Sequence, residues 1–251
     1  MLEQLSTLQL ALMTAILVLA GAIKGVLGVG LPLVAVPLLS QVVPVPLAIM
    51  TLATAQVVSN GFQAFQGGNL GAVLSRFWSL FLPLLLGLFL SARLLVTLDD
   101  RVLGLILGTL VLAFTALSAF QHRFRIEVRH EKVMSPLVGA LAGVLGGVSS
   151  FYGVPILIYL VALRLEKRFF ISAVSTAFTF GALLLMASLV FYGAMGREQF
   201  LLSGLSVIPV FGGLLVGQLI QKRMPQAAFN RGLIVIMLAT GLSLVARALW
   251  R

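Results

Sequence analysis

Two short stretches of the sequence are nearly copies of each other. The first is Gly21-Ala-Ile-Lys-Gly-Val-Leu-Gly28 and the second is Gly139-Ala-Leu-Ala-Gly-Val-Leu-Gly146, which agree at six of eight positions. Each is followed by a Gly-x-Pro triplet, Gly30-Leu31-Pro32 in the first case and Gly153-Val154-Pro155 in the second. Glycine permits tight turns, and proline cannot continue a helix. Each stretch therefore predicts a helix that breaks and restarts.

Further matches follow in the same order along the chain, which indicates an internal repeat. The aligned segments are Ile49 to Ala55 with Ile171 to Ala177, Leu82-Pro83 with Ile208-Pro209, and Gly87 with Gly213. We predict residues 1–120 as a first membrane repeat, 121–133 as a basic cytoplasmic linker and 134–251 as a second membrane repeat.

The composition predicts a chain that lies mostly in a membrane. It is 60% hydrophobic and only 10% charged, whereas a soluble domain is about 25% charged. Several apolar stretches reach the roughly 20 residues that cross a bilayer. The predicted full spans are 47–66, 76–96, 102–120, 168–191, 199–222 and 227–250. Residues 8–40 and 134–164 are interrupted by glycines and prolines. The second, with short arms 134–147 and 154–163, predicts a re-entrant hairpin or two short, tilted helices, whereas 8–40 has a longer first arm and stays open between a re-entrant hairpin and two crossings.

Basic residues orient these spans, because cytoplasmic loops are enriched in lysine and arginine. The linker holds Arg123, Arg125, Arg129 and Lys132 and is predicted to be cytoplasmic. Counting outward, both termini fall outside, and the two halves have opposite orientations. We therefore predict an all-α polytopic membrane protein with two inverted repeats, each a glycine-broken re-entrant or short helix pair followed by three transmembrane helices. Topology and anionic lipid account for the net charge of +10, so no nucleic-acid partner is predicted.

Inverted repeats with interrupted helices are typical of secondary transporters. Backbone groups freed at a break must be buried in protein or line a cavity, and the N-termini of half-helices suit an anion. Lys24 is the only ionisable side chain well inside a predicted apolar segment. Such a residue either faces a substrate or extends along its stem to the interface. For the pairs Gly21/Gly25 and Gly139/Gly143 we predict helix packing through small residues.

Polar side chains recur at helical spacing in two spans. Gln56, Asn60 and Gln63 do so after Thr54, and Ser172, Ser175 and Thr179 do so beside Thr176. They either line a solute pathway or join helices, and for the serines joining helices is favoured. The candidate substrate-binding residues are Lys24, Gly28, Gly30, Thr54, Gln56, Asn60, Gly147, Ser149, Ser150, Tyr152, Gly153, Ser175, Thr176 and Thr179.

The sequence lacks the residues that catalysis, metal binding or nucleotide binding would need. There is no cysteine, no aspartate or glutamate lies inside a predicted span, and no nucleotide-binding or nucleophile motif is present. We therefore predict no catalytic residue, no metal site and no cofactor.

At the two glycine breaks the chain resembles the sulfite exporter TauE/SafE family of bacterial transporters. The resemblance rests on Gly21 to Pro32, on Gly139 to Val148, and on the segments Ala53-Thr54-Ala55 and Ser175-Thr176-Ala177. It covers nearly the whole chain. It implies transport of a small sulfur-containing anion, such as sulfite, a sulfonate or sulfoacetate, across the bacterial inner membrane. The second break, with Ser149 to Tyr152, departs from the glycine-rich pattern of the family, which leaves the particular substrate open.

The sequence thus predicts a transporter that binds a small anion near the midplane, between the two breaks, and works by alternating access. Membrane lipid is an expected partner, while a coupling ion and a homodimer stay open. Three alternatives also stay open: a transporter of another solute such as a metal cation, a membrane enzyme acting on lipid, and a non-transporting scaffold.

Overall fold

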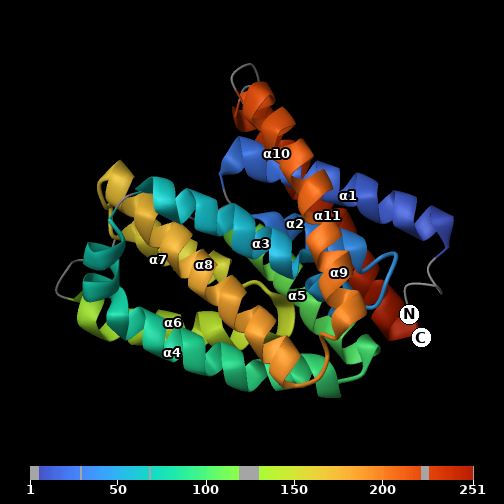
Figure 1. Cartoon of the computed structure of the whole chain (residues 1–251), viewed down its shortest axis with the longest axis horizontal. Helices are drawn as coiled ribbons and strands as arrows, with labels where there is room; N and C mark the ends of the chain where they lie inside the picture. The colour runs from blue at the N-terminus through green and yellow to red at the C-terminus, as the bar shows by residue number, and fades with distance from the viewer. Residues whose placement is uncertain (1–5, 29, 68, 119–129, 222–225, 251) are drawn as a thin grey trace. The chain divides into compact units, whose positions relative to one another are not determined.

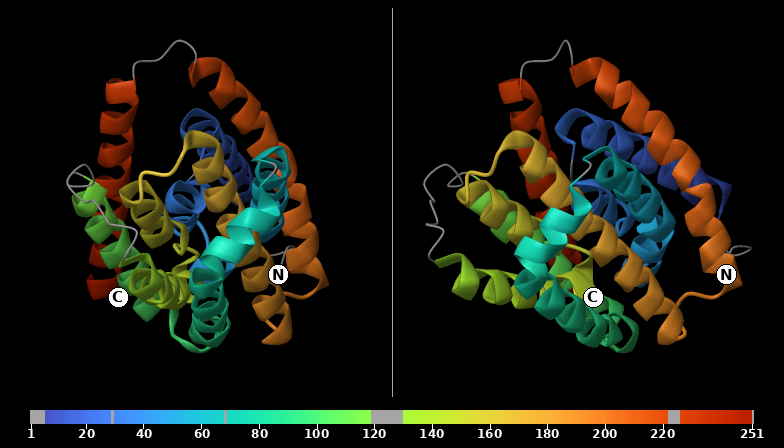
Figure 2. Two further views of the ribbon diagram at one scale, coloured as in Figure 1. Left: turned by 90° about the vertical axis from the view of Figure 1, so that its left-hand side faces the viewer. Right: turned by 60° about the vertical axis from the view of Figure 1, so that its left-hand side comes forward.

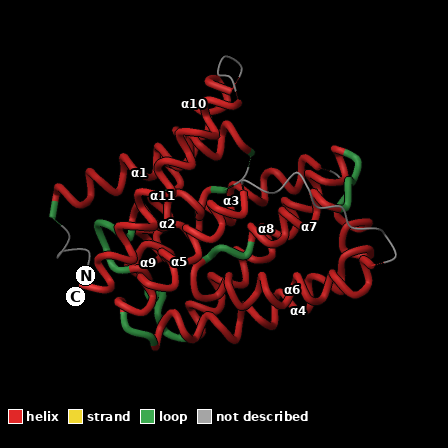
Figure 3. The backbone as a smooth tube through the Cα atoms, turned by 180° about the vertical axis from the view of Figure 1, so that it is seen from behind, coloured by secondary structure: helices red, strands yellow, loops and turns green. Residues whose placement is uncertain are grey.

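The elements of secondary structure in the described residues are α-helices joined by short loops (Figure 3). The structure is a computed structural model, and it describes residues 6–28, 30–67, 69–118, 130–221 and 226–250. In chain order the helices are α1 (Thr7–Leu27), α2 (Leu31–Leu39), α3 (Val45–Gly67), α4 (Leu70–Thr97), α5 (Asp100–Ser118), α6 (Glu131–Ser149), α7 (Gly153–Ala162), α8 (Lys167–Phe191), α9 (Arg197–Leu205), α10 (Val207–Gln221) and α11 (Gln226–Trp250) (Figure 1).

Seven helical stretches in the described residues are long and apolar enough to cross a membrane. Their outward faces are apolar, as α4 illustrates: Leu82, Leu86 and Leu90 are 54%, 57% and 68% exposed, while Leu84 and Leu88 are fully buried. A helix that is apolar on both its buried and its exposed face is suited to lipid rather than to water. The prediction of an all-α polytopic membrane protein is confirmed.

The chain divides into two compact units that cut across the predicted repeats. Unit 1 contains residues 1–55, 98–119 and 195–251, and unit 2 contains residues 56–97 and 120–194. The division falls inside α3, between Ala55 and Gln56. Each unit therefore takes segments from both halves of the sequence.

In unit 1, α1 packs closely along α10 (Figure 2). A Cβ atom at Gly21 would lie 3.0 Å from the carbonyl carbon of Val210 and closer still to its oxygen, and one at Gly25 would meet the backbone of Leu214 and Gly217 in the same way. The residue numbers rise together along both helices, so the pair is parallel. Glycine is required here because only hydrogen fits between the two backbones.

In unit 2, α6 packs along α4 through the same kind of contact. A Cβ atom at Gly139 would lie 3.0 Å from the carbonyl carbon of Leu80, and one at Gly143 would lie 2.9 Å from the amide nitrogen of Leu88. This pair is also parallel. The predicted helix-packing role of both glycine pairs is confirmed.

The two helix pairs share one contact register, which corrects part of the sequence alignment. Gly87 of α4 faces the backbone of Ala140, and Gly217 of α10 faces the backbone of Ala22 in the equivalent way. The sequence alignment had matched Gly87 with Gly213 instead. The difference is one helical turn. Because such a slip leaves the same helix face inward, apolar and small residues match almost equally well in either register.

Several helix boundaries differ from the predicted spans. Helix α4 begins at Leu70, before the predicted start at residue 76. The predicted span 199–222 is two helices, since α9 ends at Leu205 and α10 begins at Val207, although together they form one membrane-crossing stretch. The predicted arm 134–147 continues to Ser149, because the sequence past Gly147 stays compatible with a helix. Of the predicted linker 121–133, residues 121–129 lie outside the described residues.

Candidate functional site

The first predicted break lies in unit 1, between α1 and α2. Helix α1 ends at Gly28, whose backbone is left-handed with φ 77° and whose N–H donates to the carbonyl of Lys24 at 2.7 Å. Gly30, with φ 93°, precedes α2, which begins without a side-chain cap. Both positions favour glycine because other residues are strained there. The first turn of α2 therefore presents N–H groups without a side-chain acceptor.

The second predicted break lies in unit 2, between α6 and α7. Helix α6 ends at Ser150, which is left-handed with φ 65° and donates its N–H to the carbonyl of Gly146 at 2.7 Å. Helix α7 begins at Gly153, again without a side-chain cap. Gly28 and Gly146 align in the sequence, yet it is Ser150 that ends its helix as Gly28 does. The extra residues at this break thus add one turn to α6.

Ser149 holds the end of α6 together. Its hydroxyl donates to the carbonyl of Leu145 at 2.6 Å and accepts the N–H of Phe151 at 3.2 Å. Ser149 is fully buried. Its observed contacts are therefore those of a residue that shapes the turn.

Beside this turn lies a buried group of three polar side chains, Gln56, Ser150 and Tyr152, which we call the Gln56 cluster. The Gln56 amide donates to Ser150 Oγ at 3.2 Å, and the Tyr152 hydroxyl lies 3.1 Å from Gln56 Oε1. The same hydroxyl lies 3.2 Å from the carbonyl oxygen of Phe178, so its single proton has two acceptors. None of the three residues is more than 2% exposed. Residues from α3, the break and α8 thus meet in unit 2.

Small residues make room for the Tyr152 ring. A Cβ atom at Gly146 would lie 2.6 Å from Tyr152 Cβ, and one at Gly181 would lie 2.7 Å from Tyr152 Cε2. The ring of Phe178 packs edge-on against Tyr152, with centroids 5.9 Å apart, and its tip fills the space at Gly153. The position of the Tyr152 hydroxyl is therefore fixed by packing on several sides.

The polar residues of α8 divide into two kinds. Thr179 donates to the carbonyl of Ser175 at 2.7 Å, a bond within one helix that satisfies its hydroxyl. Thr176 is 1% exposed, and so is Ser172, whose Oγ has no hydrogen-bond partner in the described residues. A buried hydroxyl without a partner is costly, so Ser172 differs from Thr179 in its hydrogen bonding.

The remaining candidates have separate surroundings. Lys24 is only 2% exposed on α1, and Asn60 is 3% exposed on α3. Thr54 belongs to unit 1, where its backbone N–H donates to Ser203 Oγ at 2.8 Å and its Oγ1 accepts from Ser203 at 2.9 Å. Gly147 packs against Ser91 of α4. Substrate binding by these residues stays a prediction.

Sequence reasoning did not find Ser203, which is completely buried. It lies on α9, in a stretch whose polarity indicated an end of a span rather than a buried contact. Its partner Thr54 is 149 residues away in sequence. The predicted repeat offered no signal for it, because the pairing is set by how α3 and α9 meet.

The described residues hold no group of three or more histidine, cysteine, aspartate or glutamate side chains that could bind a metal ion. The polar atoms at the two breaks are amides, hydroxyls and backbone N–H groups. Such groups can donate hydrogen bonds to the oxygens of an anion.

Apolar spans, paired helix breaks and buried polar side chains together define a polytopic membrane protein with the features of a transporter. A family model described as sulfite exporter TauE/SafE matches residues 13–244, nearly the whole chain. The chain therefore belongs to the TauE/SafE family of membrane transporters. Searches of curated proteins and of solved structures returned no match.

Proposed function

We propose that this protein is a secondary transporter of a small, sulfur-containing anion of the sulfite, sulfonate or sulfoacetate type, and that residues of its helix breaks bind the anion. The description of its family supports the substrate class. The presence of one broken helix in each compact unit supports the mechanism, because interrupted helices in matching positions are where secondary transporters bind substrate.

The Gln56 cluster is the observation that carries this proposal. One N–H of the Gln56 amide is used by Ser150, and the second can donate to a ligand. Ser150 contributes a hydroxyl at the turn itself, and α7 begins beside it at Gly153 without a side-chain cap. The N–H of Val154 donates to the carbonyl of Phe151, so the N–H of Gly153 is the donor that this helix start adds. Sulfite and sulfonate groups have three oxygens that accept hydrogen bonds. Neutral donors beside a helix N-terminus suit such an anionic group.

The first break, in unit 1, has a basic side chain nearby, that of Lys24. Its side chain is 2% exposed on α1, one turn before the break at Gly28. The charge of an ammonium group complements that of a negative ligand. We assign to Lys24 the role of offsetting the charge of an anion at the first break, within unit 1. Ala142 aligns with Lys24 in the second sequence copy, so the two breaks differ in this respect.

The parallel glycine-packed pairs support a mechanism of alternating access. In each unit a broken-helix arm, α1 or α6, is held against a second helix, α10 or α4, with backbones in contact. A closely packed pair moves as one body more readily than it deforms. Rocking of such bodies would change the access of a bound anion. We further propose the bacterial inner membrane as the location, with both termini outside.

The test is stabilisation of the purified protein against heating by a panel of anions: sulfite, sulfate, thiosulfate, sulfoacetate, taurine and simple carboxylates. A ligand that binds only the folded state at one hundred times its Kd stabilises it by about 2.7 kcal/mol. Ser150→Gly removes the hydroxyl and keeps a residue that tolerates the left-handed backbone. Its control is Ser188→Ala on α8, where a buried hydroxyl bonds only to the carbonyl of Leu184.

Saturable stabilisation by a sulfur oxyanion or sulfonate is expected, weakened in Ser150→Gly and Lys24→Met and kept in Ser188→Ala. Stabilisation by divalent metal ions instead would favour the cation transporter. No response to any solute, together with no flux in proteoliposomes, would favour the scaffold and sink the proposal.

A further inference from the structure

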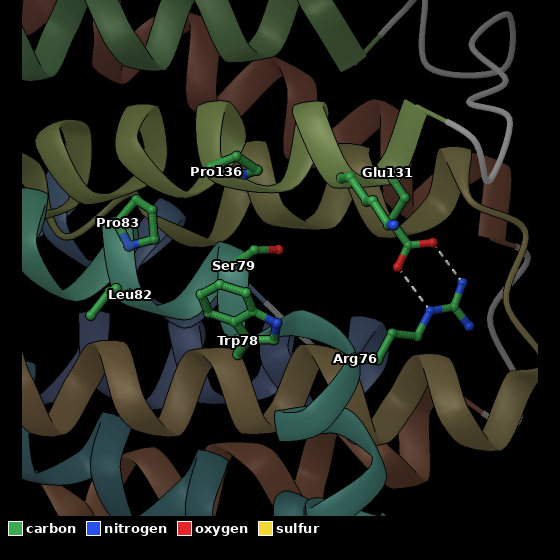
Figure 4. A pocket seen from close by; sticks show the side chains of 8 residues that line it. Arg76, Trp78, Ser79, Leu82, Pro83, Glu131 and Pro136 are labelled. Atoms are coloured by element: carbon green, nitrogen blue, oxygen red, sulfur yellow. Dashed lines mark hydrogen bonds and ion pairs between the residues drawn. The ribbon is translucent and has the colours of Figure 1, made fainter.

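A groove of about 970 Å³ lies on unit 2, between the N-terminal part of α4 and the first turns of α6 (Figure 4). It is separate from the Gln56 cluster. Its lining changes along its length: Arg76 and Lys132 at one end, Trp78 in the middle, and Leu82 with Pro83 and Pro136 beyond. We call it the α4–α6 groove.

The charged end is built from three side chains. Arg76 binds Glu131 through two parallel hydrogen bonds of 2.9 and 2.8 Å, with the guanidinium over the rings of Phe77 and Phe169. These bonds use two of the five guanidinium N–H groups. The charges of Arg76 and Glu131 cancel, so Lys132 gives this end of the groove one net positive charge. An anionic group is the complement.

The apolar end opens toward lipid. Trp78 is 65% exposed and Leu82 is 54% exposed, and Leu82 begins the exposed leucine face of α4. From Arg76 to Leu82 the helix rises about 9 Å. That is close to the depth of the headgroup layer of one leaflet, about 5–8 Å. A tryptophan between charge and leucine is the arrangement found at a membrane interface.

The two prolines change the helical hydrogen bonding beside the groove. Proline has no N–H, so Pro83 cannot donate to the carbonyl of Ser79, and Pro136 cannot donate to the carbonyl of Lys132. Both of these residues line the groove. A ligand with hydroxyl donors next to its negative charge can use carbonyl oxygens left in this way.

We propose that the α4–α6 groove binds one anionic glycerophospholipid. Its phosphate contacts Lys132 and the remaining N–H groups of Arg76, and its headgroup hydroxyls donate to the carbonyls of Ser79 and Lys132. The first methylenes of its acyl chains lie along Trp78 and Leu82. The order of charge, aromatic ring and aliphatic surface in the groove matches the order of phosphate, glycerol and acyl chain in the lipid. The bound lipid lies over the seam between α4 and α6, whose backbones are in contact at Leu80 and Gly139.

Trp78 makes the proposal directly measurable. The chain has two tryptophans, and Trp250 is 90% exposed, so Trp250→Phe leaves Trp78 as the only one. This variant is reconstituted in bilayers of phosphatidylcholine and phosphatidylglycerol, with bromine on the acyl chains of one lipid at a time. Quenching of Trp78 then reports which lipid occupies the groove. One basic side chain at a headgroup corresponds to about a fivefold preference for the anionic lipid.

Lys132→Gln is expected to abolish that preference. Arg93→Gln, which removes an equal charge from an exposed position nearer the other end of α4, is expected to keep it. Equal quenching by both lipids, or the same loss in both variants, would overturn the proposal. So would displacement by soluble glycerol phosphate, which would indicate a site for a free anion. Shielding of Trp78 from both lipids would indicate a protein partner, such as a second copy of the chain, and would also overturn it.

Discussion

The close backbone contacts in the two parallel helix pairs predict that a single added methyl group at a contact glycine destabilises the fold. At Gly21 and at Gly139 an added Cβ would lie 3.0 Å from a backbone carbonyl carbon on the neighbouring helix. Ordinary carbon contacts are about 3.5–4.0 Å. The backbones would have to separate by roughly 0.5–1 Å, since neither can move a side chain aside.

The magnitude follows from two opposed effects of Gly→Ala. Overpacking of this kind costs about 1–3 kcal/mol. Replacing glycine by alanine inside a helix returns up to about 1 kcal/mol. We therefore expect Gly21→Ala and Gly139→Ala each to lower the free energy of unfolding by about 1–2 kcal/mol. The corresponding fall in Tm is several degrees, at about 2–4 °C for each kcal/mol.

The control is Gly212→Ala, on α10 beside the same contact. A Cβ atom at Gly212 would meet nothing within 4 Å. This variant is expected to be neutral or to raise Tm, because only the helix propensity changes. The assay is the fraction of protein that stays monodisperse in detergent after heating. If Gly21→Ala and Gly139→Ala were as stable as Gly212→Ala, the close backbone contacts described above would be wrong.

Three further changes test other parts of the structure. Tyr152→Phe removes the hydroxyl bonded to Gln56 and is expected to cost about 1 kcal/mol of stability and to weaken anion binding, as seen in the same thermal assay with and without ligand. Ser203→Ala removes two hydrogen bonds to Thr54 and is expected to cost about 1–2 kcal/mol, measured as a fall in Tm; an unchanged Tm would show that water replaces the hydroxyl. Arg76→Gln leaves the carboxylate of Glu131, which is only 12% exposed, without its ion-pair partner, and we expect a lower Tm. The double variant with Glu131→Gln is expected to regain part of that Tm, whereas additive effects of the two substitutions would contradict the pairing.

The helix breaks were predictable from the sequence because they depend on local conformation. Gly28 and Gly30 adopt positive φ, and proline follows each break. The second break was placed less accurately. Nothing in the composition shows that α6 continues to Ser149, or that Ser150 rather than a glycine takes the left-handed conformation. That choice depends on the bond from Ser150 N–H to the carbonyl of Gly146 and on the burial of the turn.

The candidate site was predicted in part. Gln56, Ser150 and Tyr152 were each identified as polar residues in apolar surroundings, but their mutual contact was not. Gln56 and Ser150 are 94 residues apart. Several helix faces in this chain carry similar polar residues, so the sequence permits several pairings. Packing selects one, because the Tyr152 ring fits only where Gly146 and Gly181 leave space.

The sequence by itself determined that this chain is an all-α membrane protein with two broken helices and small-residue packing faces. These properties depend on hydropathy and on glycine and proline, which act over one or two turns. Only the tertiary structure decided that α1 pairs with α10 and α6 with α4, and that the compact units cut across the predicted repeats. Which small-residue faces meet is set by backbone fit between helices distant in sequence, and local residue patterns do not specify that fit.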